Sequence, residues 1–380
     1  MGVIYADNAA TTRLSDTAFD AMKPYMLNEY GNASTLYKLG RSAHKAVENA
    51  RGVFAKGINA LPAEIYFTSG GTESDNWAIK GTAHRLAASG KKHIVTDNIE
   101  HHAVLNSAKA LEREGFEMTY VRADKNGLVR AEDVAAAIRP DTALVSVMLA
   151  NNELGTIQPV AEIGSICRSE GVLFHCDAVQ AAGILPIDVK QMNIDLLSMS
   201  AHKFHGPKGV GIMYARRGCA PETYIDGGEQ ERGHRTGTEN VAGIVGAAAA
   251  FAEAISERNE KADRLCAMRD EIQSGLLKIP GSQVNGVTAP RLPGTLNMSF
   301  DGIDGQSLIF ELDLKGLAAS SGSACASGSV DPSHVLLALG LPYKLAHGSL
   351  RLSLGRYNTP DEAEMIVRIV SDTVAELRSN

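Results

Sequence analysis

The sequence predicts an α/β fold: a large domain with a mainly parallel seven-stranded sheet flanked by helices, and a smaller α+β domain. Short apolar segments alternate with segments of helical periodicity through the first two thirds of the 380 residues, which is typical of parallel sheets. After about Phe251, a long charged helical segment is followed by alternating strands such as Thr295–Phe300. We therefore expect a large domain over residues 15–255 and a small domain formed by residues 1–14 and 256–380.

The strands of the large sheet are predicted from short, mostly apolar runs separated by polar or glycine-containing segments. Helices are expected to begin at Thr72 and near Ala103, after the first two of these strands. The seven predicted strands are Ile65–Thr68, His93–Thr96, Met118–Arg122, Leu144–Leu149, Val172–Cys176, Leu196–Met199 and Val210–Tyr214.

Composition narrows the class of protein. The net charge of -7 gives no broad basic surface of the kind that nucleic acid requires, so no direct nucleic-acid ligand is expected. No apolar run of about 18 residues occurs, and the first residues lack the features of a signal peptide, so we expect no membrane span and a cytoplasmic protein. The five cysteines are an odd number without CxxC spacing, which argues against a disulfide framework or a structural zinc site.

Lys203 follows the predicted strand Leu196–Met199 and precedes a glycine-rich loop. Ligands of open α/β sheets gather outside the carboxyl ends of strands, and a lysine there can form a Schiff base with a carbonyl group. The alternative is a solvated surface charge.

Gly71 and Thr72 lie where a predicted strand gives way to a helix, in the segment Ser69-Gly70-Gly71-Thr72. Backbone N–H groups at such a helix start favour a phosphate, although the segment matches neither the P-loop nor the dinucleotide fingerprint. Glu73 and Asp75 would repel an anion unless their side chains turn away.

The pair His101 and His102 follows the second predicted strand and allows three interpretations: a metal site, a helix cap or an aromatic platform for a flat cofactor. A metal site needs a third ligand, and the candidates His175, Cys176 and Asp177 alternate between the two faces of one strand, so no metal site is expected. Asp177 ends that strand and suits either a helix cap or a partner for a pyridinium nitrogen.

Arg351 lies in the alternating segment 349–354, with Ser349 and Ser353 on its face and leucines on the other. We expect its guanidinium to be displayed from the strand and not buried in the core. A forked contact to a carboxylate suits this side chain, and a surface salt bridge is the alternative.

Cys325 lies among small residues and glycines in the segment 319–328, which has little to pack. Such a segment favours a mobile surface loop, here placed at about residues 319–331, and a reactive thiol. By contrast, Cys167, Cys176 and Cys266 are expected to be buried hydrophobes, and Cys219 an incidental loop thiol.

Taken in order, these segments resemble the fold-type I pyridoxal phosphate (PLP) enzymes, and within them the cysteine desulfurases of the NifS/IscS class. The resemblance runs nearly end to end. The sequence departs from the family pattern at Ala326, at His102 and in the turn at residues 31–34. These departures bear on loop dynamics and partner choice. The matching motifs are YADNAATT, FTSGGTESDN, EHHAV, NNELG, HCDAVQ, SAHKFHGPKG, RTGT, SSGSACASG and SLRLSLGR.

The resemblance implies a role for each candidate residue. Lys203 would be the Schiff-base lysine, Asp177 the partner of the pyridine nitrogen, and Cys325 the sulfur-accepting nucleophile. His101 would stack on the ring and act as acid or base, as its ordinary pKa near neutrality allows. The remaining implied contacts are Gln180 to the phenolic oxygen; Gly71, Thr72, Ser200 and His202 around the phosphate, with Thr238 from a neighbouring subunit; Asn152 beside the cofactor; and Asn152 and Arg351 to the substrate carboxylate.

The implied activity is conversion of L-cysteine to L-alanine, with the sulfur left on Cys325 as a persulfide and passed to an acceptor for iron–sulfur cluster assembly or thiolation. A homodimer is expected, with no resident metal, although Cys325 could ligate a cluster transiently. The alternatives are a selenocysteine lyase, another PLP-dependent lyase or aminotransferase, and a binding protein that has kept the fold without the activity.

Overall fold

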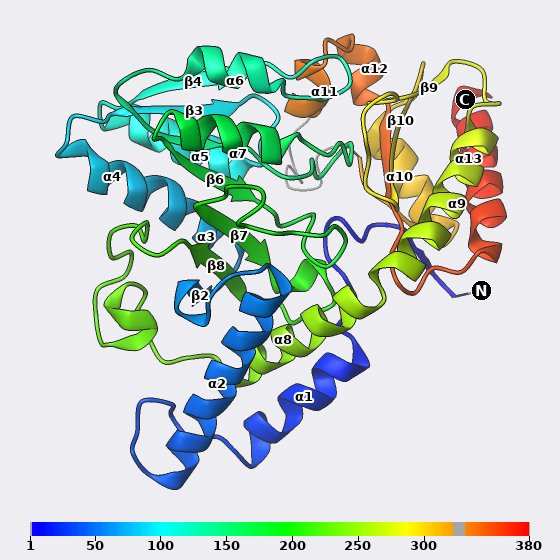
Figure 1. Ribbon diagram of the computed structural model, residues 1–380. Coiled ribbons are helices and arrows are strands. Elements are labelled where there is room, and N and C mark those ends of the chain that lie inside the picture. The colour runs from blue at the N-terminus through cyan, green and yellow to red at the C-terminus, as the bar shows by residue number, and fades with distance from the viewer. Residues whose placement is uncertain (1, 322–330, 380) are drawn as a thin grey trace.

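The computed structural model describes residues 2–321 and 331–379. Its centre is a seven-stranded sheet between layers of helices, beside a smaller three-stranded sheet that carries helices of its own (Figure 1). The predicted α/β class, with its mainly parallel seven-stranded sheet, is confirmed.

The strands of the large sheet lie in the order β2-β8-β7-β6-β5-β3-β4, and β8 runs antiparallel to the other six. Most boundaries fall within two residues of prediction, but the fourth strand ends at Ser146 and not at Leu149. Residues after Ser146 are still buried, which explains why their apolar sequence extends the predicted strand. The strands are β2 (Ile65–Thr68), β3 (His93–Asp97), β4 (Glu117–Val121), β5 (Thr142–Ser146), β6 (Leu173–Asp177), β7 (Leu196–Ser200) and β8 (Gly211–Ala215).

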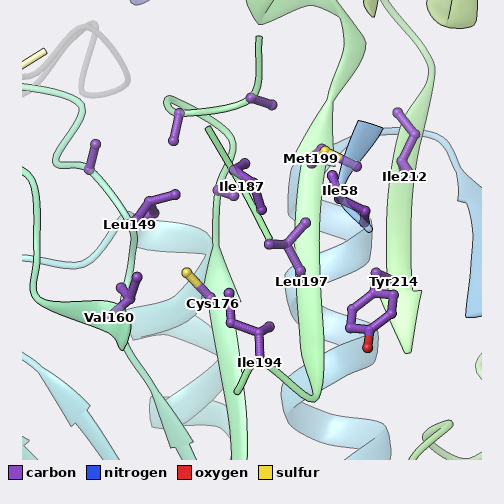
Figure 2. Packing of buried hydrophobic residues seen from close by; sticks show 14 of the residues in the cluster. Ile58, Leu149, Val160, Cys176, Ile187, Ile194, Leu197, Met199, Ile212 and Tyr214 are labelled. Carbon is purple, nitrogen blue, oxygen red and sulfur yellow. The ribbon is translucent and has the colours of Figure 1, made fainter. Parts of the chain in front are cut away.

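Helices cover both faces of this sheet, because successive strand residues point to opposite faces and apolar side chains occur on both. Leu197 and Met199 of β7 belong to one core cluster, whereas Leu196 belongs to the cluster on the opposite face. Figure 2 shows Cys176 of β6 pointing among apolar side chains beside Leu197, as expected of a core cysteine. The covering helices are α2 (Lys38–Gly57), α6 (Ala131–Ala137), α7 (Val160–Ser169) and α8 (Val241–Ser256) on the first face, and α4 (Thr82–Ala87) and α5 (His102–Arg113) on the second.

Three further helical segments complete this part of the chain. Helix α1 (Asp16–Leu27) packs on α8, and α3 (Gly71–Asn76) continues through the π-helical turn η2 (Trp77–Gly81) into α4. The short 3-10 turns are η1 (Pro62–Glu64), η3 (Ala201–Lys203) and η4 (Gln230–Gly233). Among the described residues, no helix, including the alanine-rich α8, is long and apolar enough to cross a membrane.

The smaller sheet is antiparallel, in the order β12-β10-β9, and has its own apolar core. A two-stranded pairing of β1 with β11 fixes the N-terminal arm to this part of the chain. We propose that the division into residues 15–255 and residues 1–14 with 256–380 follows these cores, although Val335 and Leu336 pack into the larger one. The elements are β1 (Ile4–Tyr5), α9 (Arg258–Leu276), β9 (Ser282–Val284), β10 (Thr295–Phe300), α10 (Gly305–Leu314), β11 (Leu317–Ala318), α11 (His334–Ala338), α12 (Tyr343–His347), β12 (Ser349–Ser353) and α13 (Asp361–Ser379).

Candidate active site

A cavity of about 330 Å³ opens at the carboxyl ends of β6 and β7, the edge at which open α/β sheets hold ligands. Asp177 is the last residue of β6 and Ser200 the last of β7, so the sheet itself aims both into this space. Ten of the predicted site residues line the cavity together: Gly71, Thr72, His101, Asn152, Asp177, Gln180, Ser200, His202, Lys203 and Arg351.

Lys203 ends the 3-10 turn that follows β7, as its predicted position after a strand requires. Its Nζ donates hydrogen bonds to the carbonyl oxygens of Ala9 and Ala10, at 2.5 and 2.8 Å. The Ala9 carbonyl also accepts from Gln180 Nε2 at 3.0 Å. The N-terminal arm therefore forms one wall of the cavity and orients two of its polar side chains.

Asp177 accepts a hydrogen bond from the Val179 N–H at 2.8 Å, which forms a local turn and not the cap of a regular helix. Burial raises the pKa of Asp177 to about 6, against the lowering effects of that hydrogen bond and of the Lys203 charge. A buried carboxyl group with such a pKa can be held in either protonation state by the group that faces it.

Glu73 and Asp75, the two acidic residues that follow Thr72, have different surroundings. The Glu73 carboxylate turns aside to Arg235, with 2.7 Å between Oε1 and Nε, and to the backbone N–H of Ser69. Asp75 is instead 1% exposed and lines the cavity, and its Oδ1 lies 3.7 Å from His175 Nε2. Burial and the neighbouring Asp177 charge raise the pKa of Asp75, so its carboxyl group is held towards the neutral form.

Sequence reasoning missed Asp75 as a cavity residue. Asp75 lies three residues after Thr72, so on a helix the two side chains share one face. This spacing could have predicted that Asp75 lies beside Thr72 in the cavity.

His101 caps α5: its Nδ1 accepts a hydrogen bond from the Ala103 N–H at 3.1 Å. Burial, and then the nearby Lys203 charge, lower the pKa of His101 to about 4. The pKa of His101 thus lies below its ordinary value, and the ring is neutral near pH 7. Since Nδ1 accepts, the proton of the neutral ring lies on Nε2.

The neighbouring His102 stands beside His334, with 4.6 Å between ring centroids, and both line the cavity. His334 donates from Nε2 to the Glu100 carbonyl at 3.0 Å. It begins α11 far along the chain, so nothing in its own sequence context indicated this position. In the described part of the chain, no group of three or more His, Cys, Asp or Glu side chains is placed to hold a metal ion.

Arg351 is only 2% exposed, so the expectation of a displayed guanidinium was wrong. The alternation itself is correct, because Leu350 and Leu352 pack into the smaller core. The opposite face of β12 is covered by the arm and by the cavity wall: Nη2 of Arg351 contacts Asp7 Oδ1 at 2.7 Å, and Nη1 donates to the Asn152 carbonyl at 3.0 Å.

Two predicted residues are not among those that line the cavity. Thr238 is exposed in the loop before α8, and Cys325 lies outside the described residues. The four described cysteines are free thiols; Cys167, Cys176 and Cys219 are buried, but Cys266 is partly exposed. Cys266 was expected to be buried, and it lies beside the buried stripe of α9, which Leu265 and Met268 form.

Residues 4–366 match the family model described as Aminotransferase class-V. The chain belongs to this family. A curated relative from Methanosarcina thermophila, named Cysteine desulfurase IscS, is 50% identical over 99% of this chain and 93% of its own length. A solved structure described as a NifS-like protein has a TM-score of 0.93 and 39% identity, covering 99% of this chain and 100% of the other. Another, described as SspA in complex with cysteine, has a TM-score of 0.82 and 36% identity, covering 93% and 99%.

Class-V aminotransferases and their cysteine desulfurase members are PLP-dependent, and the cavity fits that cofactor. Three buried polar atoms of the lining, Asp75 Oδ1, Asn152 Oδ1 and Arg351 Nε, have no hydrogen-bond partner among the described residues, which a polar ligand would correct. Gly71 also keeps space at the start of α3, where a Cβ would lie 2.6 Å from Val179 Cγ2.

The burial of one acidic residue, Asp97, predicts a pH-dependent stability. Asp97, at the end of β3, is fully buried, and burial raises its pKa to about 7, above its ordinary value of 3.8. The folded chain thus binds this proton more tightly than the unfolded chain, so its contribution to the free energy of unfolding falls as the pH rises from about 4 to about 7.

Denaturant unfolding of the cofactor-free protein at pH 5 and pH 7 isolates this contribution when the wild-type protein is compared with Asp97→Asn. Between these two pH values the free energy of unfolding should change less favourably in the wild-type protein than in Asp97→Asn, by roughly 1–3 kcal/mol. Equal pH slopes in the two proteins would contradict this assignment.

Proposed function

We propose that this chain is a PLP-dependent cysteine desulfurase, which converts L-cysteine to L-alanine and leaves the sulfur on Cys325 as a persulfide. The observation that carries the proposal is the cavity that Lys203, Asp177 and Arg351 line together. The chain's high identity to a curated cysteine desulfurase over nearly its full length supports the same activity, and the solved relative described as complexed with cysteine supports the substrate.

The residues that would hold PLP follow from their positions in the cavity. When bound, PLP supplies an electron sink for bonds at the α carbon of an amino acid. Lys203 would bond to its carbonyl carbon and Asp177 would face its ring nitrogen. The other proposed contacts are His101 at the ring face, Gln180 at the phenolic oxygen, Asn152 beside the ring, and Gly71, Thr72, Ser200, His202 and the Thr238 of a neighbouring subunit around the phosphate.

Lys203 is the proposed carrier of the α proton. When its amino group is free, the Ala9 and Ala10 carbonyls would keep that group inside the cavity. An amine positioned beside the substrate can take a proton from it and return the proton at another atom. His101 would assist as a neutral ring that donates from Nε2.

Cys325 completes the reaction by attacking the substrate sulfur as a thiolate. A sulfur–sulfur bond forms, and the carbon–sulfur bond of the substrate breaks, with its electron pair staying on carbon. Protonation of that carbon then gives alanine, so the overall change is cysteine plus thiol to alanine plus persulfide. The persulfide would pass to an acceptor such as an iron–sulfur scaffold or a thiolation enzyme.

We propose a homodimer in which Thr238 of one chain reaches the phosphate of the other. Its exposed position supports this, as do the exposed apolar side chains of Phe19, Met26, Tyr30 and Leu36 on α1 and the segment that follows it. Sedimentation should report a dimer, and an active monomer would contradict the proposal.

The free thiols of the described cysteines support a cytoplasmic location.

The deciding experiment incubates the PLP-loaded protein with L-cysteine and measures alanine, sulfide and persulfide. A desulfurase gives alanine in step with transferred sulfur when a reductant or acceptor is present. Alanine that forms without persulfide on Cys325 would favour a thiol-independent lyase, and no alanine would favour an aminotransferase or a binding protein.

Replacing Arg351 by lysine should weaken cysteine binding while the cofactor stays bound. Lysine cannot contact Asp7, the Asn152 carbonyl and a substrate carboxylate in the forked geometry of a guanidinium. The Michaelis constant for cysteine should rise by an amount equivalent to about 1–3 kcal/mol, the size of a charged hydrogen bond. Arg139→Lys, in the exposed pair with Asp141, is the control, and an unaltered constant in Arg351→Lys would overturn the assignment.

A further inference from the structure

The guanidinium of Arg351 is held at one end by a residue that none of the proposed roles includes. Asp7 Oδ1 contacts Nη2 at 2.7 Å, and the side chain of Asp7 is 16% exposed against 2% for Arg351. Nη1 is engaged by the Asn152 carbonyl. Nε is buried and has no acceptor among the described residues. Two of the five N–H groups of the guanidinium are thus engaged, and the other three, on Nε, Nη1 and Nη2, are left for a ligand in the cavity that Arg351 lines.

Asp7 is itself fixed on both oxygens. Its Oδ2 accepts from Ser320 Oγ at 3.1 Å, and its carbonyl accepts from the Tyr5 hydroxyl at 3.0 Å. Its backbone bridges to Ser353 of β12, and Ser320 bridges to Arg351 on the same strand. If the carboxylate swings away from Arg351, it also loses the hydrogen bond from Ser320 Oγ, while the backbone contacts keep the residue itself in place.

The charge of Asp7 has a second effect. A carboxylate that binds the remaining N–H groups meets a guanidinium already paired with Asp7, and two carboxylates on one cation repel each other. Arg351 thus binds a carboxylate less tightly than an unpaired arginine would. This suits a site whose substrate and product carry the same α-carboxylate, since tight binding of the product would slow its release.

We propose that Asp7 is a positioning residue for substrate recognition: it fixes Arg351 with the remaining N–H groups of the guanidinium left for the amino-acid α-carboxylate, and its charge limits the affinity for that carboxylate. This inference rests on the proposed function only in taking an α-amino acid as the ligand.

The test is calorimetric titration of the PLP-loaded protein with L-alanine and with ethylamine, which is L-alanine without its carboxylate. Asp7→Asn keeps an oxygen acceptor for Nη2 and removes the charge, so L-alanine should bind roughly fivefold more tightly. Asp7→Ala removes the acceptor, so L-alanine should bind about tenfold more weakly or worse. Ethylamine binding should change by less than about twofold in both, because it has no group for Arg351.

If Asp7 had only a structural role, the affinities for L-alanine and ethylamine would change together, or the affinity for L-alanine would change in the same direction in Asp7→Asn and Asp7→Ala. Either result overturns the proposal. Ser320→Ala removes only the hydrogen bond to Oδ2 of Asp7, so it should weaken L-alanine binding about twofold. This variant tests the proposal if the Asp7 variants do not fold. The exposed Asp141→Asn is the control for loss of a surface carboxylate. If alanine is not formed from cysteine but the two Asp7 variants still diverge, the proposed function fails and this inference stands.

Discussion

Lys203→Ala should lose alanine formation by about a thousandfold or more while keeping its fold, because one side chain both attaches the cofactor and moves the α proton. The apolar contacts that hold β7 in the sheet come from Leu196, Leu197 and Met199, which the substitution leaves in place. Borohydride reduction followed by mass spectrometry should attach PLP to the Lys203 peptide in the wild-type protein and to no peptide in the variant.

A matched control is Lys190→Ala, an exposed lysine between β6 and β7 that contacts Asn59. It should keep both the attached PLP and the turnover rate. Wild-type turnover in Lys203→Ala, or PLP attached elsewhere in the wild-type protein, would remove Lys203 from the mechanism.

The sequence could predict those parts of the site whose positions depend on neighbouring residues in the chain, such as the ends of strands and the starts of helices. Strand β2 was predicted to the residue, and Asp177 and Lys203 stand where apolar runs end, so the sheet brings them to one edge. The cap position of His101 also follows from its place before a helical pattern.

The parts that the sequence could not predict depend on contacts between distant segments. Burial of Arg351 comes from the N-terminal arm, since its partner Asp7 lies 344 residues away. The shifted pKa of His101 depends on its burial and on the charges of Lys203 and His334, which lie far along the chain. Glu73 is turned from the cavity by Arg235, which no local pattern links to it.

Cys325→Ser should reduce alanine and persulfide formation from cysteine to background, a loss of about a thousandfold or more, while PLP remains attached to Lys203. A serine hydroxyl is a poor nucleophile towards sulfur at neutral pH, whereas the thiolate of an accessible cysteine is a strong one. Cysteine should still bind the variant, because Arg351 and the rest of the described cavity are unchanged. Binding is measured as the change in the visible absorption of the PLP-loaded protein, and chemistry as alanine released.

Mass spectrometry of the wild-type protein after brief exposure to cysteine should find added sulfur on the Cys325 peptide and on no other cysteine peptide. Cys266→Ser is the matched control, because Cys266 is the partly exposed thiol of the described chain, and its loss should leave turnover unchanged. Cys167, Cys176 and Cys219 are buried, and burial raises the pKa of each thiol, which disfavours the thiolate that sulfur transfer needs. Alanine formation at the wild-type rate in Cys325→Ser would therefore overturn the desulfurase mechanism and leave a thiol-independent lyase, such as a selenocysteine lyase, as the better account.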